Sequence, residues 1–253
     1  MSIARREKVL TLLRENGTVM LKELEKLFPE ISSMTLRRDL EYFENLGEAV
    51  RIRGGARYIR TMGEQEDVYA LRAAKNQDAK NKIARLALKF IEPRRSVYID
   101  AGSTGMFLAR SLPDLNFSVV TSGINVAMEI SKRYKPSVTM LGGLINRNNL
   151  AASGNQSGQI ISQLNIDTAL IVGSAFSLKN GFTVGNYEEG VLKKSIISKA
   201  EKVIMLIDSS KFVKTMPFTF AHMEDIDILI TDKRPSEEVM ELAQKSQIKV
   251  IYE

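Results

Sequence analysis

The sequence predicts an α/β protein in two parts, a small N-terminal domain of helices and a hairpin, and a larger domain on a mostly parallel sheet. Within the first 60 residues, three helical patterns precede two short strand patterns joined by Gly-Gly. From residue 96 onward, short runs of Val, Ile and Leu alternate with helical stretches. Such runs are typical of parallel strands that are buried on both faces.

The small domain begins with two helical segments. Apolar residues at helical spacing in residues 3–13 predict a first helix, which ends near Asn16-Gly17 because Gly is a common helix stop. Leucines at every third position across residues 21–27 predict a second, shorter helix, which Phe28-Pro29 closes.

The segment Ile31–Leu40 predicts a third helix with two different sides. Ser32 or Ser33 can cap it, since a serine hydroxyl accepts hydrogen bonds from the N–H groups of the first turn. The apolar side recurs at spacings of four and three, at Leu36, Leu40 and Phe43. The side chains pointing elsewhere are Thr35, Arg37 and Arg38. In isolation this pattern is more typical of an amphipathic helix with a solvated arginine pair than of a DNA reader.

A basic hairpin pattern follows and changes that interpretation. Residues 48–53 alternate like a strand, Gly54-Gly55 predicts a turn, and residues 56–59 return. The segment 51–60 carries no acid and four cations, namely Arg51, Arg53, Arg57 and Arg60. Such cations can straddle DNA phosphates, and an arginine can grip guanine through two hydrogen bonds. The pattern therefore predicts a winged helix-turn-helix that binds double-stranded DNA through Ser32, Ser33, Thr35, Arg37, Arg38, Arg51, Arg53 and Arg57.

Composition permits this interpretation without proving it. The 253 residues carry a formal charge of +6 and are 44% hydrophobic, enough for an ordinary core. The absence of cysteine excludes disulfides and thiolate metal sites, and no cofactor is expected. No apolar run reaches the roughly 20 residues of a membrane span, and no signal core is evident. We expect a cytoplasmic protein with a DNA-binding domain at 1–60, a linker at 61–78 and an α/β domain at 79–253.

Seven strands and six helices are predicted for the larger domain. The strand candidates are residues 97–99, 117–121, 138–141, 168–172, 203–207, 226–231 and 248–252. The helices are expected near residues 79–91, 104–112, 123–133, 156–163, 188–200 and 236–245.

Three of these strands end in polar residues. Asp100-Ala-Gly102-Ser103-Thr104-Gly105 follows the first, Thr121-Ser122-Gly123 the second and Asp208-Ser-Ser-Lys211 the fifth. The carboxyl ends of parallel strands meet at one edge, where helix N-termini favour anions. One such turn is more often only a helix cap, but three at one edge favour a site for phosphate or a similar anion.

Motifs in both domains resemble those of a known family. The first domain contains Ser32-x-Met-Thr35-Leu-Arg37-Arg38-Asp39-Leu40, then Arg53-Gly54-Gly55-Ala56. The second contains Lys80-x-x-Ile83-Ala84, Asp100-x-Gly102-Ser103-Thr104, Val120-Thr121-Ser122, Leu141-Gly142-Gly143 and Asp208-x-Ser210-Lys211-Phe212. From end to end, the chain resembles the DeoR-type bacterial transcription regulators. Its second domain resembles the sensor fold related to ribose-5-phosphate isomerase and glucosamine-6-phosphate deaminase.

This resemblance implies a repressor of a sugar-metabolism operon, modulated by a phosphorylated sugar effector. Because operators are read as repeated half-sites, a homo-oligomer, either dimer or tetramer, is expected. The resemblance implies phosphate binding by Ser103, Thr104, Gly105, Ser122 and Lys211, with Gly102 and Thr121 in the same motifs. It also implies that Asp100, Glu189 and Lys193 bind the sugar hydroxyls or form a loop over the site.

Two other classes stay open. One is a sugar-phosphate isomerase or deaminase with an attached DNA-binding domain, and the other is a DNA-binding module whose larger domain only oligomerises. Where such enzymes place acids, Gly173-Ser174-Ala175-Phe176 offers no carboxylate as general base. Many family members also have Thr-Asn at Thr121-Ser122, which leaves the ligand open.

Several other motifs favour ordinary structure. The only histidine, His222, lies in a segment typical of a surface connection. Gly142-Gly143 and Gly181–Gly185 are expected to be turns, since neither matches a phosphate-loop motif. Glu188-Glu189 with Lys193-Lys194 predicts either a surface ion-pair ladder or part of a lid.

Overall fold

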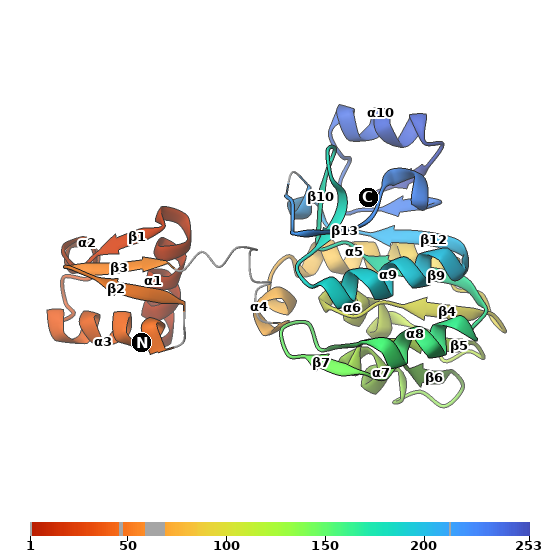
Figure 1. Ribbon diagram of the computed structural model, residues 1–253, viewed down its shortest axis with the longest axis horizontal. Coiled ribbons are helices and arrows are strands. Elements are labelled where there is room, and N and C mark those ends of the chain that lie inside the picture. The colour runs from red at the N-terminus through yellow and green to blue at the C-terminus, as the bar shows by residue number, and fades with distance from the viewer. Residues whose placement is uncertain (1, 46–47, 59–68, 213) are drawn as a thin grey trace. The chain divides into compact units, whose positions relative to one another are not determined.

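The structure confirms the predicted fold class. The computed structural model describes residues 2–45, 48–58, 69–212 and 214–253. Contacts divide the chain into two compact units, Met1–Glu64 and Gln65–Glu253. Figure 1 shows the helices and small sheet of the first unit and the large parallel sheet of the second. No helix among the described residues combines the length and apolarity needed to cross a membrane.

The smaller unit is a three-helix fold closed by a three-stranded antiparallel sheet. Its elements are α1 (Ser2–Asn16), β1 (Thr18–Met20), α2 (Leu21–Leu27), α3 (Ser33–Asn45), β2 (Ala49–Ile52) and β3 (Gly55–Tyr58). The strand order is β1-β3-β2. The three helices and the hairpin are as predicted, whereas β1 was not. The core contains Val9, Leu13, Leu24, Leu36, Leu40 and Phe43.

Each of the two glycines in the hairpin has its own structural reason. Gly54 has φ +81°, a left-handed conformation that other residues adopt only with strain. A Cβ atom on Gly55 would collide with the carbonyl oxygen of Val19 in β1. The first glycine therefore makes the turn, and the second lets β3 pair with β1.

A buried carboxylate joins α1 to α3. Asp39 is 1% exposed, and its two oxygens lie 2.6 Å from Nε of Arg5 and 2.8 Å from Nε of Arg6. Burial by itself would raise the pKa of Asp39, but the hydrogen bonds from Arg5 and Arg6 outweigh it, so the pKa lies below its usual value. Asp39 thus fixes the angle between the first helix and the helix that carries Arg37 and Arg38.

The larger unit is built on a seven-stranded sheet in which every pairing is parallel. Its strands are β4 (Ser96–Ile99), β5 (Ser118–Thr121), β6 (Ser137–Met140), β9 (Ile166–Val172), β12 (Ala200–Leu206), β14 (Ile228–Ile230) and β15 (Lys249–Ile251). All seven correspond to predicted strands.

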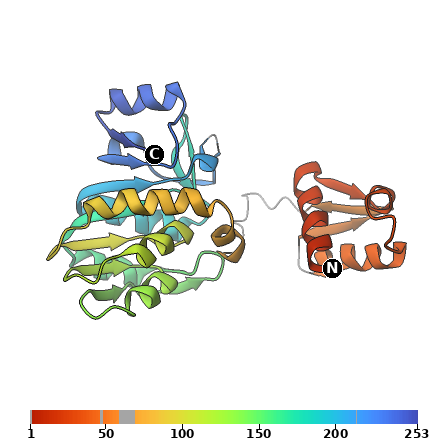
Figure 2. The same ribbon diagram turned by 180° about the vertical axis from the view of Figure 1, so that it is seen from behind.

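Helices cover both faces of this sheet, as Figures 1 and 2 show from opposite sides. One face packs on α5 (Gln77–Ala87), α6 (Ser103–Ser111) and α7 (Ile124–Ile130); the other packs on α8 (Asn155–Ser162), α9 (Tyr187–Lys199) and α10 (Glu237–Lys245). Successive strand residues alternate between these layers, so Ile99 packs in the first and Tyr98 in the second. Burial on both faces explains the continuous apolar runs in the sequence.

The order β15-β14-β12-β9-β4-β5-β6 reverses direction beside β4. From β4 the chain first builds outward through β5 and β6, then returns to place β9 on the other side of β4. In doubly wound sheets, a crevice forms at the carboxyl ends of the two strands flanking such a reversal. Asp100 directly follows β4, and Val172 ends β9. These two residues therefore mark where the fold favours ligand binding.

Several short elements of the larger unit have no clear pattern in the sequence. They are α4 (Tyr69–Ala74), β7 (Leu144–Asn146), β8 (Ala151–Ser153), β10 (Ala175–Ser177), β11 (Gly181–Val184), β13 (Phe218–Ala221) and the 3₁₀ turns Ser209–Lys211 and Met223–Asp225. The helix predicted at 79–91 forms α5 followed by the 3₁₀ turn Leu88–Phe90. The expectation that Gly181–Gly185 is a turn was wrong. Residues Gly181–Val184 form the central strand of the sheet β10-β11-β13, because Phe182 and Val184 are fully buried in the core.

Replacing Asp39 with Ala should destabilise the smaller unit by about 2 kcal/mol, because two guanidinium groups lose a buried partner while keeping some access to water. The lowered pKa of Asp39 means that its contribution is present above pH ~4 and is lost as pH falls through the folded-state value. Hydrogen exchange of α1 and α3 amides at neutral and acid pH measures this. The exposed Glu41→Ala is the control, and an equal effect of both variants would contradict the assignment.

Candidate functional site

The start of α3 presents hydroxyl groups that already have protein partners. The hydroxyl of Ser32 accepts from the N–H of Thr35 at 3.3 Å and lies 3.0 Å from the Thr35 hydroxyl. The Ser33 hydroxyl donates to the Glu25 carboxylate of α2 at 2.6 Å. Ser32 therefore caps the helix, while Ser33 ties it to α2. Both serines remain exposed.

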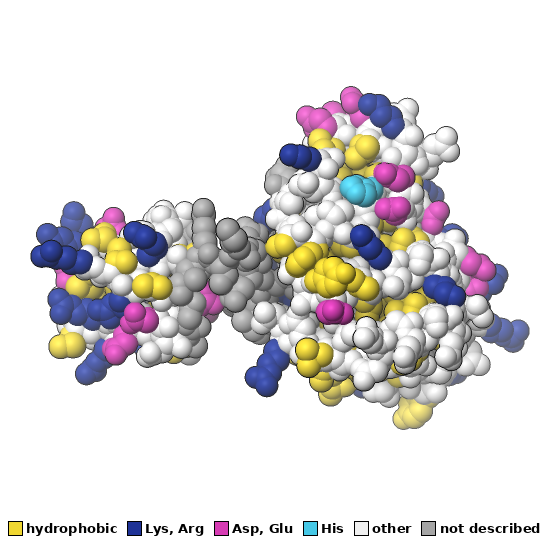
Figure 3. All heavy atoms as spheres, in the orientation of Figure 1, with side chains coloured by type: hydrophobic (Ala, Val, Ile, Leu, Met, Phe, Trp, Pro, Cys, Tyr) yellow, Lys and Arg dark blue, Asp and Glu magenta, His cyan; other side chains and the backbone are white. Residues whose placement is uncertain are grey.

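Five arginines are exposed on α3 and the hairpin, namely Arg37, Arg38, Arg51, Arg53 and Arg57. Helix α3 packs against β2, and the Glu44 carboxylate of α3 accepts from the backbone N–H of Arg51 at 3.1 Å. Figure 3 shows several Lys and Arg side chains on the smaller unit. Arg60 lies outside the described residues. The other candidate arginines thus belong to two adjoining elements of one compact unit.

In the larger unit, the N-terminus of α6 opens toward the carboxyl edge of the sheet. Its cap residue Gly102 has no side chain to accept from the first-turn N–H groups, and Ser103 and Thr104 are buried just beyond it. A Cβ atom on Gly105 would collide with the carbonyl oxygen of Asp100, so glycine lets the helix start this close to β4. First-turn N–H groups of this kind favour an anion.

The hydroxyl groups of the second predicted loop already form hydrogen bonds within the protein. Thr121 is fully buried, and its hydroxyl accepts from the N–H of Gly123 at 3.0 Å. The Ser122 hydroxyl lies 3.0 Å from the phenol oxygen of Tyr98, which in turn donates to Asp100 at 3.2 Å. Thr121 therefore stabilises the start of α7, and Ser122 joins a network around Asp100.

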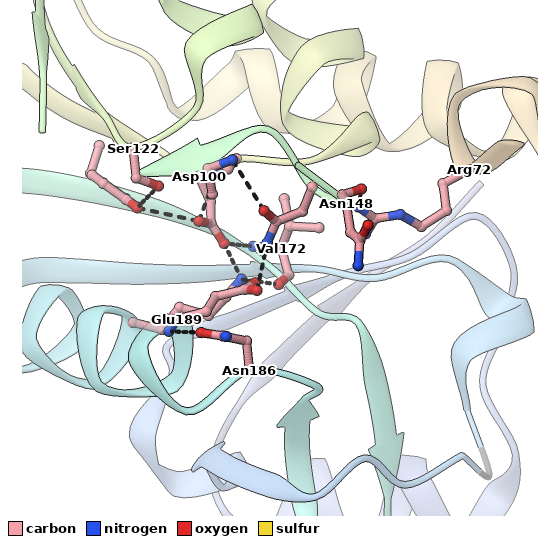
Figure 4. A network of polar contacts seen from close by, with 12 residues as sticks. Arg72, Asp100, Ser122, Asn148, Val172, Asn186 and Glu189 are labelled. Atoms are coloured by element: carbon pink, nitrogen blue, oxygen red, sulfur yellow. Dashed lines mark hydrogen bonds and ion pairs between the residues drawn. The ribbon is translucent and has the colours of Figure 1, made fainter. Parts of the chain in front are cut away.

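Asp100 is the centre of that network, which Figure 4 shows. One carboxylate oxygen accepts from Tyr98 and from the backbone N–H of Ala101; the other accepts from the N–H of Val172 at 2.9 Å and from the Lys193 ammonium. Because each oxygen has two donors, Asp100 is saturated by the protein. Its carboxylate joins β4, β9 and α9 at the reversal of the sheet.

Lys193 is 1% exposed, so the predicted surface ladder was wrong for this residue. Its ammonium contacts Asp100, lies 3.3 Å from the Glu189 carboxylate and donates to the Val172 carbonyl at 2.8 Å. Burial alone would lower the pKa of Lys193, but the charges of Asp100 and Glu189 outweigh it and raise the pKa. Glu189 also accepts from the Asn149 amide at 2.7 Å.

A second group of polar side chains, which the sequence did not predict, surrounds Lys80. Lys80 of α5 is 3% exposed and donates to the carbonyl oxygens of Arg72 and Lys75 at the end of α4. Desolvation lowers the pKa of Lys80; Asp208 opposes this, while Lys211 and Arg72 add to it. Lys80 belongs to the motif Lys80-x-x-Ile83-Ala84, but no sequence pattern predicted α4 or the position of Arg72.

This group adjoins the third predicted loop. The amide of Asn76 donates to the Ser210 hydroxyl at 2.9 Å and to the Asp208 carboxylate at 3.3 Å. It therefore links the start of α5 to the loop that carries Lys211. The charges of Asp208, Lys211 and Arg72 all act on the Lys80 ammonium here, the first in the opposite sense to the other two.

A winged helix-turn-helix joined to a doubly wound α/β unit defines a two-domain DNA-binding regulator. Residues 5–62 match the DeoR-like helix-turn-helix domain and residues 75–233 match the DeoR C terminal sensor domain. The chain belongs to the DeoR family of transcription regulators.

Two regulators and one solved structure are similar to the chain. The HTH-type transcriptional repressor GlcR of Bacillus subtilis is 29% identical, with 96% of this chain and 93% of that protein covered. A putative aga operon transcriptional repressor of Escherichia coli is 29% identical, with 98% and 92% covered. A ribose 5-phosphate isomerase A structure from Methanocaldococcus jannaschii shares 18% identity at a TM-score of 0.41, with 55% and 56% covered.

Replacing Lys193 with Met should destabilise the larger unit by about 3–5 kcal/mol, because Asp100 then keeps a buried charge without its cation. The raised pKa of Lys193 means that the wild-type ion pair contributes below about pH 10 and is lost as pH rises through the folded-state value. Chemical unfolding at several pH values measures this. Lys194→Met, on the exposed side of α9, should change stability by less than about 0.5 kcal/mol. Equal losses in both variants would refute the buried pair.

Proposed function

We propose that this DNA-binding regulator represses a sugar-metabolism operon and is released by a phosphorylated sugar bound at the carboxyl edge of its parallel sheet. The observation that carries the proposal is the buried ammonium of Lys80, whose pKa is lowered by burial and by the charges of Lys211 and Arg72, while Asp208 opposes the change. Like charges in a desolvated place repel one another, and a phosphate would offset that repulsion. The names of the two related repressors support the direction of regulation.

Phosphate would bind between the α6 start and the loop of Lys211. Ser103, Thr104 and Gly105 offer N–H groups and hydroxyls there, and Lys211 offers an ammonium. Gly102 leaves the helix start open, while Thr121 and Ser122 shape the neighbouring loop. Asp100, Glu189 and Lys193 hold this edge together through their mutual contacts, so we assign them to positioning rather than to direct contact.

Two features support binding without turnover. The segment Gly173–Phe176 carries no carboxylate, and Asp100 already accepts four hydrogen bonds. A general base needs a free acceptor within reach of the substrate proton. Measurable isomerisation of ribose-5-phosphate by the pure protein would overturn this part of the proposal.

On DNA, α3 would enter the major groove and the hairpin would contact phosphates. Operators contain repeated half-sites, so the working unit would be a homo-oligomer acting in the cytoplasm. A coupling of about 1–3 kcal/mol between effector and operator sites would give a 5- to 150-fold switch.

Arg38→Ala should reduce operator affinity by about 1–3 kcal/mol at one base-pair position if this arginine reads a base. Arg51→Ala should instead weaken binding to all sequences and reduce the salt slope by about one unit. Titrations of operator and single-substitution operators at several salt concentrations measure both effects. If Arg38→Ala weakens binding equally on all operators, Arg38 contacts a phosphate. Arg37 would then be the candidate for reading the base.

Phosphorylated sugars should raise the thermal unfolding temperature, whereas their unphosphorylated parents should not. A ligand at 100 times its dissociation constant stabilises the native state by about 2.7 kcal/mol. Lys211→Ala should abolish the shift, and the exposed Lys214→Ala should preserve it. Equal shifts with the parent sugars, or none in a broad screen, would favour a domain that only oligomerises. Loss of operator binding on adding the active sugar is expected; a gain would indicate activation.

A further inference from the structure

Met34 is the second residue of α3 (Figure 1). Among the described residues of the smaller unit it is the most exposed large apolar residue, at 62%. At about 100° of rotation per residue, it points about 180° away from Phe43, which packs in the core. An exposed methionine is not unusual in itself, because folded proteins keep much apolar surface. What distinguishes Met34 is its position on α3.

Two arginines flank Met34 one helical turn further along α3. Because residues three and four apart are neighbours on a helix, Arg37 and Arg38 lie about 60° and 40° to either side of Met34. All three residues are exposed. Glu41 follows on the same exposed side, and DNA phosphates repel its carboxylate. The part of this side that can approach DNA closely is therefore the segment from Met34 to Arg38.

The hydroxyl groups at the start of α3 already have partners within the protein. The Ser32 hydroxyl lies 3.0 Å from that of Thr35. The Ser33 hydroxyl donates to the Glu25 carboxylate at 2.6 Å. In a helix-turn-helix, the N-terminal residues of the recognition helix contact base edges in the major groove. At this end of α3, Met34 thus offers an exposed side chain whose contacts are mainly apolar.

The major groove presents one apolar group to such a side chain, the 5-methyl group of thymine. The edges of the other three bases present hydrogen-bonding groups there. We propose that Met34 contacts the methyl group of one thymine in each operator half-site and so determines the base at that position. This inference rests on the proposed docking of α3 in the major groove.

The geometry of α3 also limits where this thymine lies. Met34 and Arg38 are separated by a rise of about 6 Å along the helix. Successive base pairs are about 3.4 Å apart. We therefore expect the thymine within about two base pairs of the base that Arg38 or Arg37 reads.

The first experiment removes only the methyl group from the DNA. Duplexes that bind the full chain are selected from a random-sequence pool, and deoxyuridine then replaces each thymine in turn. At one thymine of each half-site, wild-type affinity should fall about fourfold, the effect of one buried methyl group. Met34→Ala should bind the thymine and deoxyuridine duplexes equally at that position and keep the wild-type losses elsewhere. Met128→Ala, at a residue 66% exposed on α7, is the matched control and should behave as wild type.

Two further variants separate an apolar contact from an effect of side-chain length. Met34→Leu keeps an apolar side chain and should still bind thymine more tightly than deoxyuridine. Met34→Gln has a similar length but a polar end, and it should lose this preference. Because Met34 is exposed, all three substitutions should leave the thermal unfolding temperature unchanged.

The assignment of Met34 is overturned if no thymine within reach of α3 loses affinity when its methyl group is removed. It is equally overturned if Met34→Ala keeps the wild-type loss at every position. In both cases Arg37→Ala and Arg38→Ala would still weaken binding, because α3 would still lie in the groove. If instead neither arginine variant changes the affinity, the proposed docking of α3 itself fails.

Discussion

The buried pair of Asp100 and Lys193 is the interaction on which the larger unit depends. It lies where the sheet reverses direction, and it joins the end of β4, the end of β9 and the middle of α9. A buried ion pair is stable only when further hydrogen bonds satisfy its charged groups. Tyr98, Ala101, Val172 and Glu189 supply those bonds. The crevice that other doubly wound proteins leave open for ligands is therefore partly filled by the protein's own charges.

The contacts of Asp100 and Lys193 occupy the polar groups at the reversal of the sheet. The Lys193 ammonium is already paired with Asp100 and Glu189, so its charge is neutralised within the protein. Lys80 carries its charge at 3% exposure, hydrogen-bonded to two backbone carbonyls and acted on by the opposite charge of Asp208. The same network fixes the inner side of α9 and so determines which of its residues face outward. One set of contacts thus joins the edge of the sheet to the packing and orientation of α9.

In the smaller unit, too, a buried carboxylate paired with cations orients a helix. Asp39 is buried between two arginines of α1 and orients α3, whose opposite side presents Arg37 and Arg38. A core of about nine buried apolar side chains would not by itself fix the helix angle. The directional hydrogen bonds of a carboxylate supply that orientation.

The sequence by itself determined the fold class, the seven parallel strands and the helices of the winged domain, because apolar periodicity and Gly-Gly or Pro signals are local. It also determined where hydroxyl-rich loops follow strands. It could not place β1, α4 or the sheet β10-β11-β13, since these short segments are stabilised by partners distant in the chain. Nor could it reveal that Lys193 is buried while Lys194 is exposed, because both belong to one charged run. Only the tertiary structure decided that, because a buried charge depends on which distant residues surround it.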